Sequence, residues 1–99
     1  MRGVNKVVLS GNVTSDVTFN QTRSGVDVCT FEMVSERGGG ENGHKVYAKV
    51  NVYLENLVAL CGDRLTKGRY VIVDGELMNR NGRSEELTEV RARDIVFTN

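Results

Sequence analysis

Residues 45–53 of the chain, Lys-Val-Tyr-Ala-Lys-Val-Asn-Val-Tyr, alternate strictly between aliphatic side chains and polar or aromatic ones. Successive side chains of a β-strand point to opposite faces, so this alternation is typical of a strand with one face in the core. The other face contains no acid and consists of Lys45, Tyr47, Lys49, Asn51 and Tyr53. The segment therefore predicts a half-buried strand whose exposed face is basic and aromatic.

Apolar positions elsewhere predict four more strands and a single helix. The strands are expected at residues 4–13, 26–36, 69–78 and about 85–97, the last with a shift in the parity of its buried residues. Residues 17–20 are interpreted as a continuation of the first strand after a bulge. Leucine and cysteine recur every four residues within residues 54–65, which predicts a helix there, and Gly68 follows as a stop signal.

Glycine residues mark the expected bends and turns. Gly11 stands where a barrel strand would bend, and Asn81-Gly82 is a strong two-residue hairpin signal because both positions tolerate positive φ. The elements follow in the order of three strands, one helix and two strands. We therefore predict an all-β chain, folded as a five-stranded OB-fold barrel with one helix between strands 3 and 4. Such barrels bind oligonucleotides or oligosaccharides on one face.

Length and charge narrow the choice of partner. At 99 residues the chain is expected to form one domain over residues 1–99. Its 13 basic and 13 acidic residues balance, which argues against a strong duplex-DNA binder but not against one basic groove. The lysines and tyrosines of residues 45–53 favour single-stranded nucleic acid, because cations bind phosphates and aromatic rings stack on any base. The plainer alternative is an ordinary solvated strand face.

Metal, cofactor and catalytic functions find no support in the sequence. Cys29 and Cys61 lie in apolar contexts without a Cys-x-x-Cys pair, and His44 is the only histidine, so the ligands of a zinc site are missing. No catalytic arrangement of serine, cysteine and histidine is indicated, and no Walker phosphate-binding motif is present. The chain has no long apolar run and no signal peptide. We expect a cytoplasmic protein that is not an enzyme and has no cofactor.

Motifs spread along the whole chain carry a family resemblance. They are Val-Asn-Lys-Val-Val-Leu-Ser-Gly at residues 4–11, Asp16, Thr-x-Ser-Gly at 22–25, Val28, Phe31, the strand and helix of residues 50–65, Lys-Gly-x-x-Val-x-Val-x-Gly-x-Leu at 67–77, and Thr-Glu-Val at 88–90. In this order and spacing, over residues 4–97, the chain resembles the bacterial and phage single-stranded DNA-binding proteins, the SSB family.

The resemblance implies sequence-independent binding of single-stranded DNA in DNA replication, recombination or repair, commonly by a homotetramer. Members of the family stack bases on aromatic residues of the third strand. The matching positions are Tyr47, where a tryptophan is usual, and Tyr53, where a phenylalanine is usual. Arg80 and Arg83 match a hairpin that the family uses to track DNA.

Further basic and polar residues are expected to contact DNA around these rings. They are Lys45, Lys49 and Asn51 on the strand face, and Lys6, Arg23 and Arg37 in loop positions. Arg91 and Arg93 share a parity with Glu89 and are set aside as ion-paired within the sheet.

The chain departs from the family pattern at several points. It contains no tryptophan, and Asp74 and Glu76 make the outer face of the fourth strand acidic. It ends at Asn99 without the acidic tail through which the family recruits replication proteins, so such partners stay possible but have no acidic tail to recruit them.

Two alternatives stay open. A primosomal accessory protein of the same fold would be dimeric, whereas a DNA-coating protein is expected to be tetrameric. An oligomeric interaction module without DNA binding would bury Tyr47 and Tyr53 between subunits. No membrane partner is expected.

Overall fold

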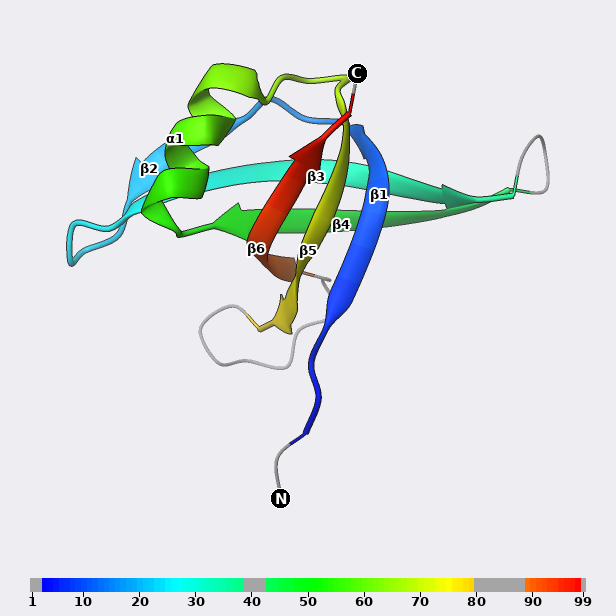
Figure 1. Cartoon of the computed structure of the whole chain (residues 1–99), viewed down its shortest axis with the longest axis horizontal. Coiled ribbons are helices and arrows are strands. Elements are labelled where there is room, and N and C mark those ends of the chain that lie inside the picture. Colours follow the sequence, from blue (N-terminus) through cyan, green and yellow to red (C-terminus); the bar gives the residue numbers. More distant parts are fainter. Residues whose placement is uncertain (1–2, 39–42, 80–88, 99) are drawn as a thin grey trace.

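The computed structural model describes residues 3–38, 43–79 and 89–98. The elements within them are β1 (Val7–Val13), β2 (Thr18–Gln21), β3 (Asp27–Arg37), β4 (His44–Val52), α1 (Glu55–Arg64), β5 (Tyr70–Met78) and β6 (Glu89–Phe97). Figure 1 shows α1 at one end of the long β3–β4 hairpin, while the other end of the hairpin extends past β1.

Five of the strands close into a barrel. Neighbouring strands follow the order β1, β5, β6, β4 and β3. The barrel closes because β3 also pairs with β1. These pairings are antiparallel except the one between β4 and β6, which is parallel. The OB-fold barrel predicted from the order of elements is therefore confirmed.

The place of the helix in the strand order was predicted wrongly, because residues 18–21 form a strand of their own. β1 pairs with β3 through Val13, and β2 resumes the pairing along β3 from Thr18. The ladder is interrupted at Ser15, whose hydroxyl accepts the backbone N–H of Glu32 at 2.8 Å. The helix consequently lies between β4 and β5 instead of between strands 3 and 4, although it forms within the residues expected.

Closure of the barrel depends on Gly11 in β1. This residue is buried, and a Cβ atom built on it would overlap the carbonyl oxygen of Val34 in β3. Only glycine lets the two backbones approach this closely. The bend expected at Gly11 therefore corresponds to the point where β1 crosses from β5 to β3.

A β-bulge in β6 accounts for the parity shift expected in the last strand. Asp74 lies opposite Asp94, whereas the next residue of β5, Gly75, lies opposite Ala92. Arg93 is thus the extra residue of the bulge. The bulge changes the parity of the residues that face the core, so both Ala92 before it and Ile95 after it are buried.

The core lies between the inward faces of the strands, and α1 closes one end of it. Leu57 and Cys61 of the helix are buried there together with Leu65, which follows the helix. Cys29 of β3 and Cys61 are free, fully buried thiols. Contact with Cys61, together with burial, raises the pKa of the Cys29 thiol.

Some of the predicted features lie outside the described residues. The Asn81-Gly82 turn, with Arg80 and Arg83 beside it, falls within residues 80–88, and the middle of the glycine-rich hairpin tip falls within residues 39–42. Within the described part of the chain, no helix is long and apolar enough to cross a membrane.

Candidate nucleic-acid interface

The outward face of β4 follows the predicted alternation only in part, because Val46, expected in the core, is 51% exposed, but it displays one largely exposed ring. Tyr47 has 63% of its surface exposed, and Lys45 beside it is exposed as well. Lys49 and Tyr53 are half-buried. The face therefore runs from the free end of the β3–β4 hairpin, where Tyr47 stands clear of the barrel, to the start of α1, where Tyr53 is flanked by other elements.

Asn51 has the predicted parity, yet it is buried, with only 4% of its surface exposed. Its side-chain oxygen accepts a 3.0 Å hydrogen bond from the hydroxyl of Thr30 on β3. Its side-chain nitrogen donates to Glu89 Oε1 on β6 at 2.9 Å and approaches Met78 Sδ on β5 at 3.6 Å. Asn51 therefore uses its amide to join four strands of the barrel beneath the candidate face.

The lysines of this face have acidic neighbours on the adjacent strands. Lys45 Nζ lies 3.7 Å from Glu36 Oε1, and both side chains are more than half exposed. Lys49 stands opposite Glu32 on β3 and opposite Glu89 on β6. β4 considered alone is free of acids, but the sheet around it carries both signs of charge. An exposed ion pair contributes only about 0–1 kcal/mol, so Lys45 can exchange Glu36 for a phosphate at little energetic expense.

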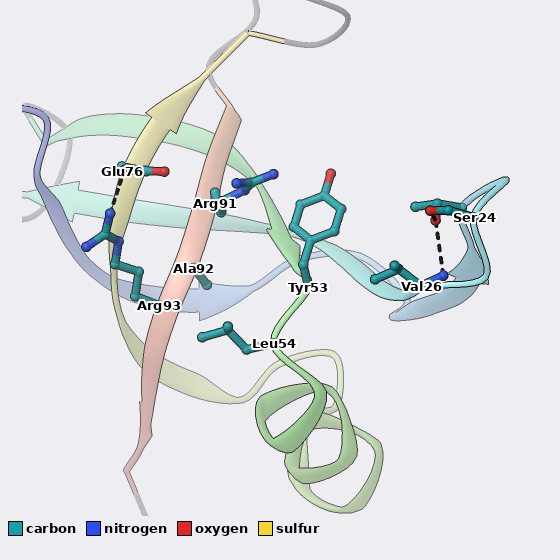
Figure 2. A pocket seen from close by; sticks show the side chains of 9 residues that line it. Ser24, Val26, Tyr53, Leu54, Glu76, Arg91, Ala92 and Arg93 are labelled. Atoms are coloured by element: carbon teal, nitrogen blue, oxygen red, sulfur yellow. Dashed lines mark hydrogen bonds and ion pairs between the residues drawn. The ribbon is translucent and has the colours of Figure 1, made fainter.

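A second cluster surrounds Tyr53 at the other end of β4. The guanidinium of Arg91 on β6 lies over the Tyr53 ring, 4.7 Å from its centroid. Figure 2 shows the ring between Arg91 on one side and the β2–β3 hairpin, with Ser24 and Val26, on the other. A cavity of about 520 Å³ lies beside the ring, and its lining extends from the hairpin past Leu54 to Glu76, Ala92 and Arg93 on β5 and β6.

Arg91 is the site residue that sequence reasoning missed. Arg93 is ion-paired within the sheet, as expected, and its Nη2 lies 2.9 Å from Glu76 Oε2. Its partner is Glu76 and not Glu89. Among the described residues, Arg91 has no carboxylate partner and stacks on Tyr53 instead. The parallel pairing of β4 with β6, which places Arg91 next to Asn51 in register, had no signal in the sequence.

The loop residues are distributed around the molecule. Arg37 closes β3 at the free end of the β3–β4 hairpin, near Lys45 in register. Arg23 lies in the β2–β3 hairpin, between two residues that line the cavity at Tyr53. Lys6 precedes β1, next to Asn5, whose side chain hydrogen bonds to the backbone of Leu77. The structure thus brings Arg37 to the Tyr47 end and Arg23 to the Tyr53 end.

Asp74 and Glu76, the two acids of the fourth predicted strand, have different neighbours. Glu76 is paired with Arg93, whereas Asp74 lies opposite a second acid, Asp94. Across the described ranges, no cluster of three or more histidine, cysteine, aspartate or glutamate side chains could hold a metal ion.

Comparisons with known proteins agree on one family. Residues 4–99 match the model of the single-strand binding protein family. Single-stranded DNA-binding protein 2 of Chlorobaculum tepidum is 36% identical over 110 residues, which cover the whole chain and 74% of the relative. The single-stranded DNA-binding protein of Xanthomonas axonopodis pv. citri is 32% identical over 100 residues, which cover 96% of this chain and 55% of the relative.

A solved structure shows the same fold. The Plasmodium falciparum SSB, determined in complex with ssDNA, superposes with a TM-score of 0.84 and 24% identity, covering 100% of this chain and 98% of the other. The matched family is one of binding proteins, in agreement with the expectation that the chain is not an enzyme. The match to the family model over nearly the whole length, together with the 36% identical relative, shows that the chain belongs to the single-strand binding protein family.

Proposed function

We propose that the protein binds single-stranded DNA without sequence preference, in DNA replication, recombination or repair. The observation that carries this proposal is the pair of tyrosines on one face of β4, Tyr47 exposed and Tyr53 beside a cavity, in a member of this family. Every base has a π-face, so stacking on these rings does not depend on sequence. The relatives named above are single-stranded DNA-binding proteins, which supports the same partner here.

The two rings serve different nucleotides. Tyr47 and Tyr53 are six residues apart, which corresponds to roughly 20 Å along an extended strand. The DNA therefore runs along β4, with one base on each ring and further nucleotides between them. Lys45 and Lys49 lie on this path and contact the phosphates, while Asn51 holds the strands below it.

The mixed charge of the face predicts a moderate dependence on salt. Lys45 is paired with Glu36, and Arg93 is paired with Glu76. Each phosphate that is neutralised adds about 0.7 to the slope of log affinity against log salt for a single strand. Because several cations already have protein partners, we expect fewer net phosphate contacts than the number of basic residues suggests.

A second copy of the chain is proposed to pack on a different face. On the outer side of β1, β5 and β6, Val8 is 58% exposed and Val96 is 49% exposed. Ile72 pairs in register with Val96 and is half-buried, while Val8 lies opposite Asp74 on the same face. Exposed apolar side chains gathered on one face are typical of an interaction surface. Association there leaves Tyr47 and Tyr53 free for DNA, which disfavours the interaction module that would bury both rings.

Binding and mass are measured together. Fluorescence anisotropy of a labelled oligo-dT strand, titrated at low salt and again at increasing salt, is expected to show micromolar or tighter binding that weakens with salt. Light scattering of the same samples gives the mass, and a tetramer favours the coating protein whereas a dimer favours the primosomal accessory protein. Absence of binding at low salt would refute the proposal.

A further inference from the structure

Arg91 is held over the Tyr53 ring and has no carboxylate partner among the described residues. A stacked guanidinium presents its plane to the ring, while its N–H groups point outward in the plane. Arg91 is exposed, and its guanidinium is 4.7 Å from the ring centroid. One face of the Tyr53 ring is thus occupied by a cation that can still bind an anion.

The charge of Arg91 is not cancelled by the acid nearest to it in register. Glu76 stands directly opposite Arg91 on β5. Its Oε2 atom, however, accepts a 2.9 Å hydrogen bond from Arg93 Nη2. Glu76 is thus neutralised by Arg93, and among the described residues that line the cavity the remaining charge is the positive charge of Arg91.

The cavity at the ring has room for a base and a lining that suits one. Its volume of about 520 Å³ lies within the usual range of small-ligand pockets, which is roughly 300–1,000 Å³. Val26 and Leu54 supply exposed apolar walls. Thr22 and Ser24 add hydroxyl groups at the hairpin, 3.1 Å apart. Apolar walls with a few hydroxyls at one side match a flat ring with polar edges.

We propose that Arg91, Tyr53 and this cavity form one nucleotide-binding unit, in which the guanidinium binds the phosphate and the base lies between Tyr53 and the β2–β3 hairpin. This unit rests on the single-strand binding proposed above. The guanidinium covers one face of Tyr53, so the base stacks on the other face. Arg91 also restricts the rotation of the ring, which lowers the entropy lost when the base binds.

The test compares two arginines that both stack on aromatic rings. Arg69 lies over Phe97, 5.3 Å from the ring centroid, toward the other end of β6, and its loss changes the net charge by the same amount. Affinity for oligo-dT and its salt dependence are measured for Arg91→Ala and Arg69→Ala, each verified as folded by thermal unfolding. Arg91→Gln, which keeps most of the stem, is measured alongside.

Arg91→Ala and Arg91→Gln are expected to weaken binding about tenfold, which is the loss of one charge-assisted contact, and to lower the salt slope by about 0.7. Arg69→Ala is expected to stay within about twofold of the unsubstituted protein. Equal losses at both arginines, or an unchanged affinity without Arg91, would overturn the nucleotide-binding unit alone. Failure of the unsubstituted protein to bind oligo-dT would overturn the proposed function together with it.

The base itself is located by NMR. When oligo-dT is added, the backbone amide signals of Ser24 and Val26 are expected to shift, and in Tyr53→Ala these shifts are expected to be lost. Binding of oligo-dT without any change at Ser24 and Val26 would place the base elsewhere and overturn the role of the cavity.

Discussion

The buried amide of Asn51 donates a 2.9 Å hydrogen bond to the carboxylate of Glu89, across the one parallel strand pair that the described residues form. Both side chains are 4% exposed. The same amide accepts the hydroxyl of Thr30, so one residue joins β3, β4 and β6 directly under the face that carries the tyrosines. A polar contact inside the sheet therefore lies directly beneath that face.

Replacement of Asn51 is expected to destabilise the protein more than it weakens DNA contacts. Asn51→Ala removes one hydrogen bond from the half-buried hydroxyl of Thr30 and one from the buried carboxylate of Glu89, which should lower the free energy of unfolding by about 1–3 kcal/mol. Urea denaturation measures this change. Lys45→Ala, on the same strand but in an exposed ion pair, is the control and should change stability by less than about 1 kcal/mol. Similar losses for both variants would contradict the structural role of Asn51.

Gly11→Ala is expected to disrupt closure of the barrel. The new methyl group would overlap the carbonyl oxygen of Val34, and both backbones belong to paired strands that cannot separate without breaking hydrogen bonds. We expect a loss of at least about 3 kcal/mol in unfolding free energy, or failure to fold. Gly62→Ala is the matched control, because Gly62 lies within α1 with open space around it. That change should stabilise the helix by up to about 1 kcal/mol, so a stable Gly11→Ala protein would show that the barrel closes differently.

Loss of either stacking ring is expected to weaken binding of oligo-dT without changing the oligomer. Tyr47→Ala and Tyr53→Ala should each reduce the free energy of binding by about 1–3 kcal/mol, whereas Tyr47→Phe, which keeps the ring, should bind nearly as well as the unsubstituted protein. Anisotropy and light scattering measure the two properties. Dissociation of the oligomer in Tyr47→Ala, with no effect on affinity, would support the interaction module instead.

The apolar outer face of β1, β5 and β6 is expected to hold the oligomer together. Val96→Glu introduces a charge next to Ile72, its partner in register, so it should lower the mass in light scattering, because burying an unpaired carboxylate is costly. Val46→Glu is the control, since Val46 is similarly exposed but lies on β4. An unchanged mass in Val96→Glu would place the interface elsewhere.

Removal of the acid that pairs with Lys45 is expected to strengthen binding. Glu36→Gln leaves Lys45 without its 3.7 Å partner and removes one negative charge near Tyr47. Affinity at low salt should rise a few-fold, and the gain should fade as salt is added, because both charges are exposed. Glu55→Gln, on α1, removes the same charge elsewhere and is expected to have a smaller effect. Equal effects of the two variants would show that only net charge matters.

Much of the fold was predictable because its signals are local. Strict alternation over residues 45–53, four-residue spacing in the helix and glycine at bends each reflect the geometry of a few neighbouring residues. The short strand β2 was the exception, and it displaced the helix in the strand order. Its separation depends on the hydrogen bond between Ser15 and the backbone of Glu32, which are far apart in the sequence.

The sequence by itself determined which side chains of β4 share a face, because parity follows directly from the pleat of a strand. Only the tertiary structure decided what surrounds that face. The parallel pairing with β6 places Glu89 and Arg91 beside β4, 38 residues from Asn51 and Tyr53 respectively. That pairing buries Asn51, places an acid opposite Lys49 and covers one side of Tyr53 with a guanidinium. Alternation specifies the direction of a side chain, but its neighbours depend on how distant strands meet when the barrel closes.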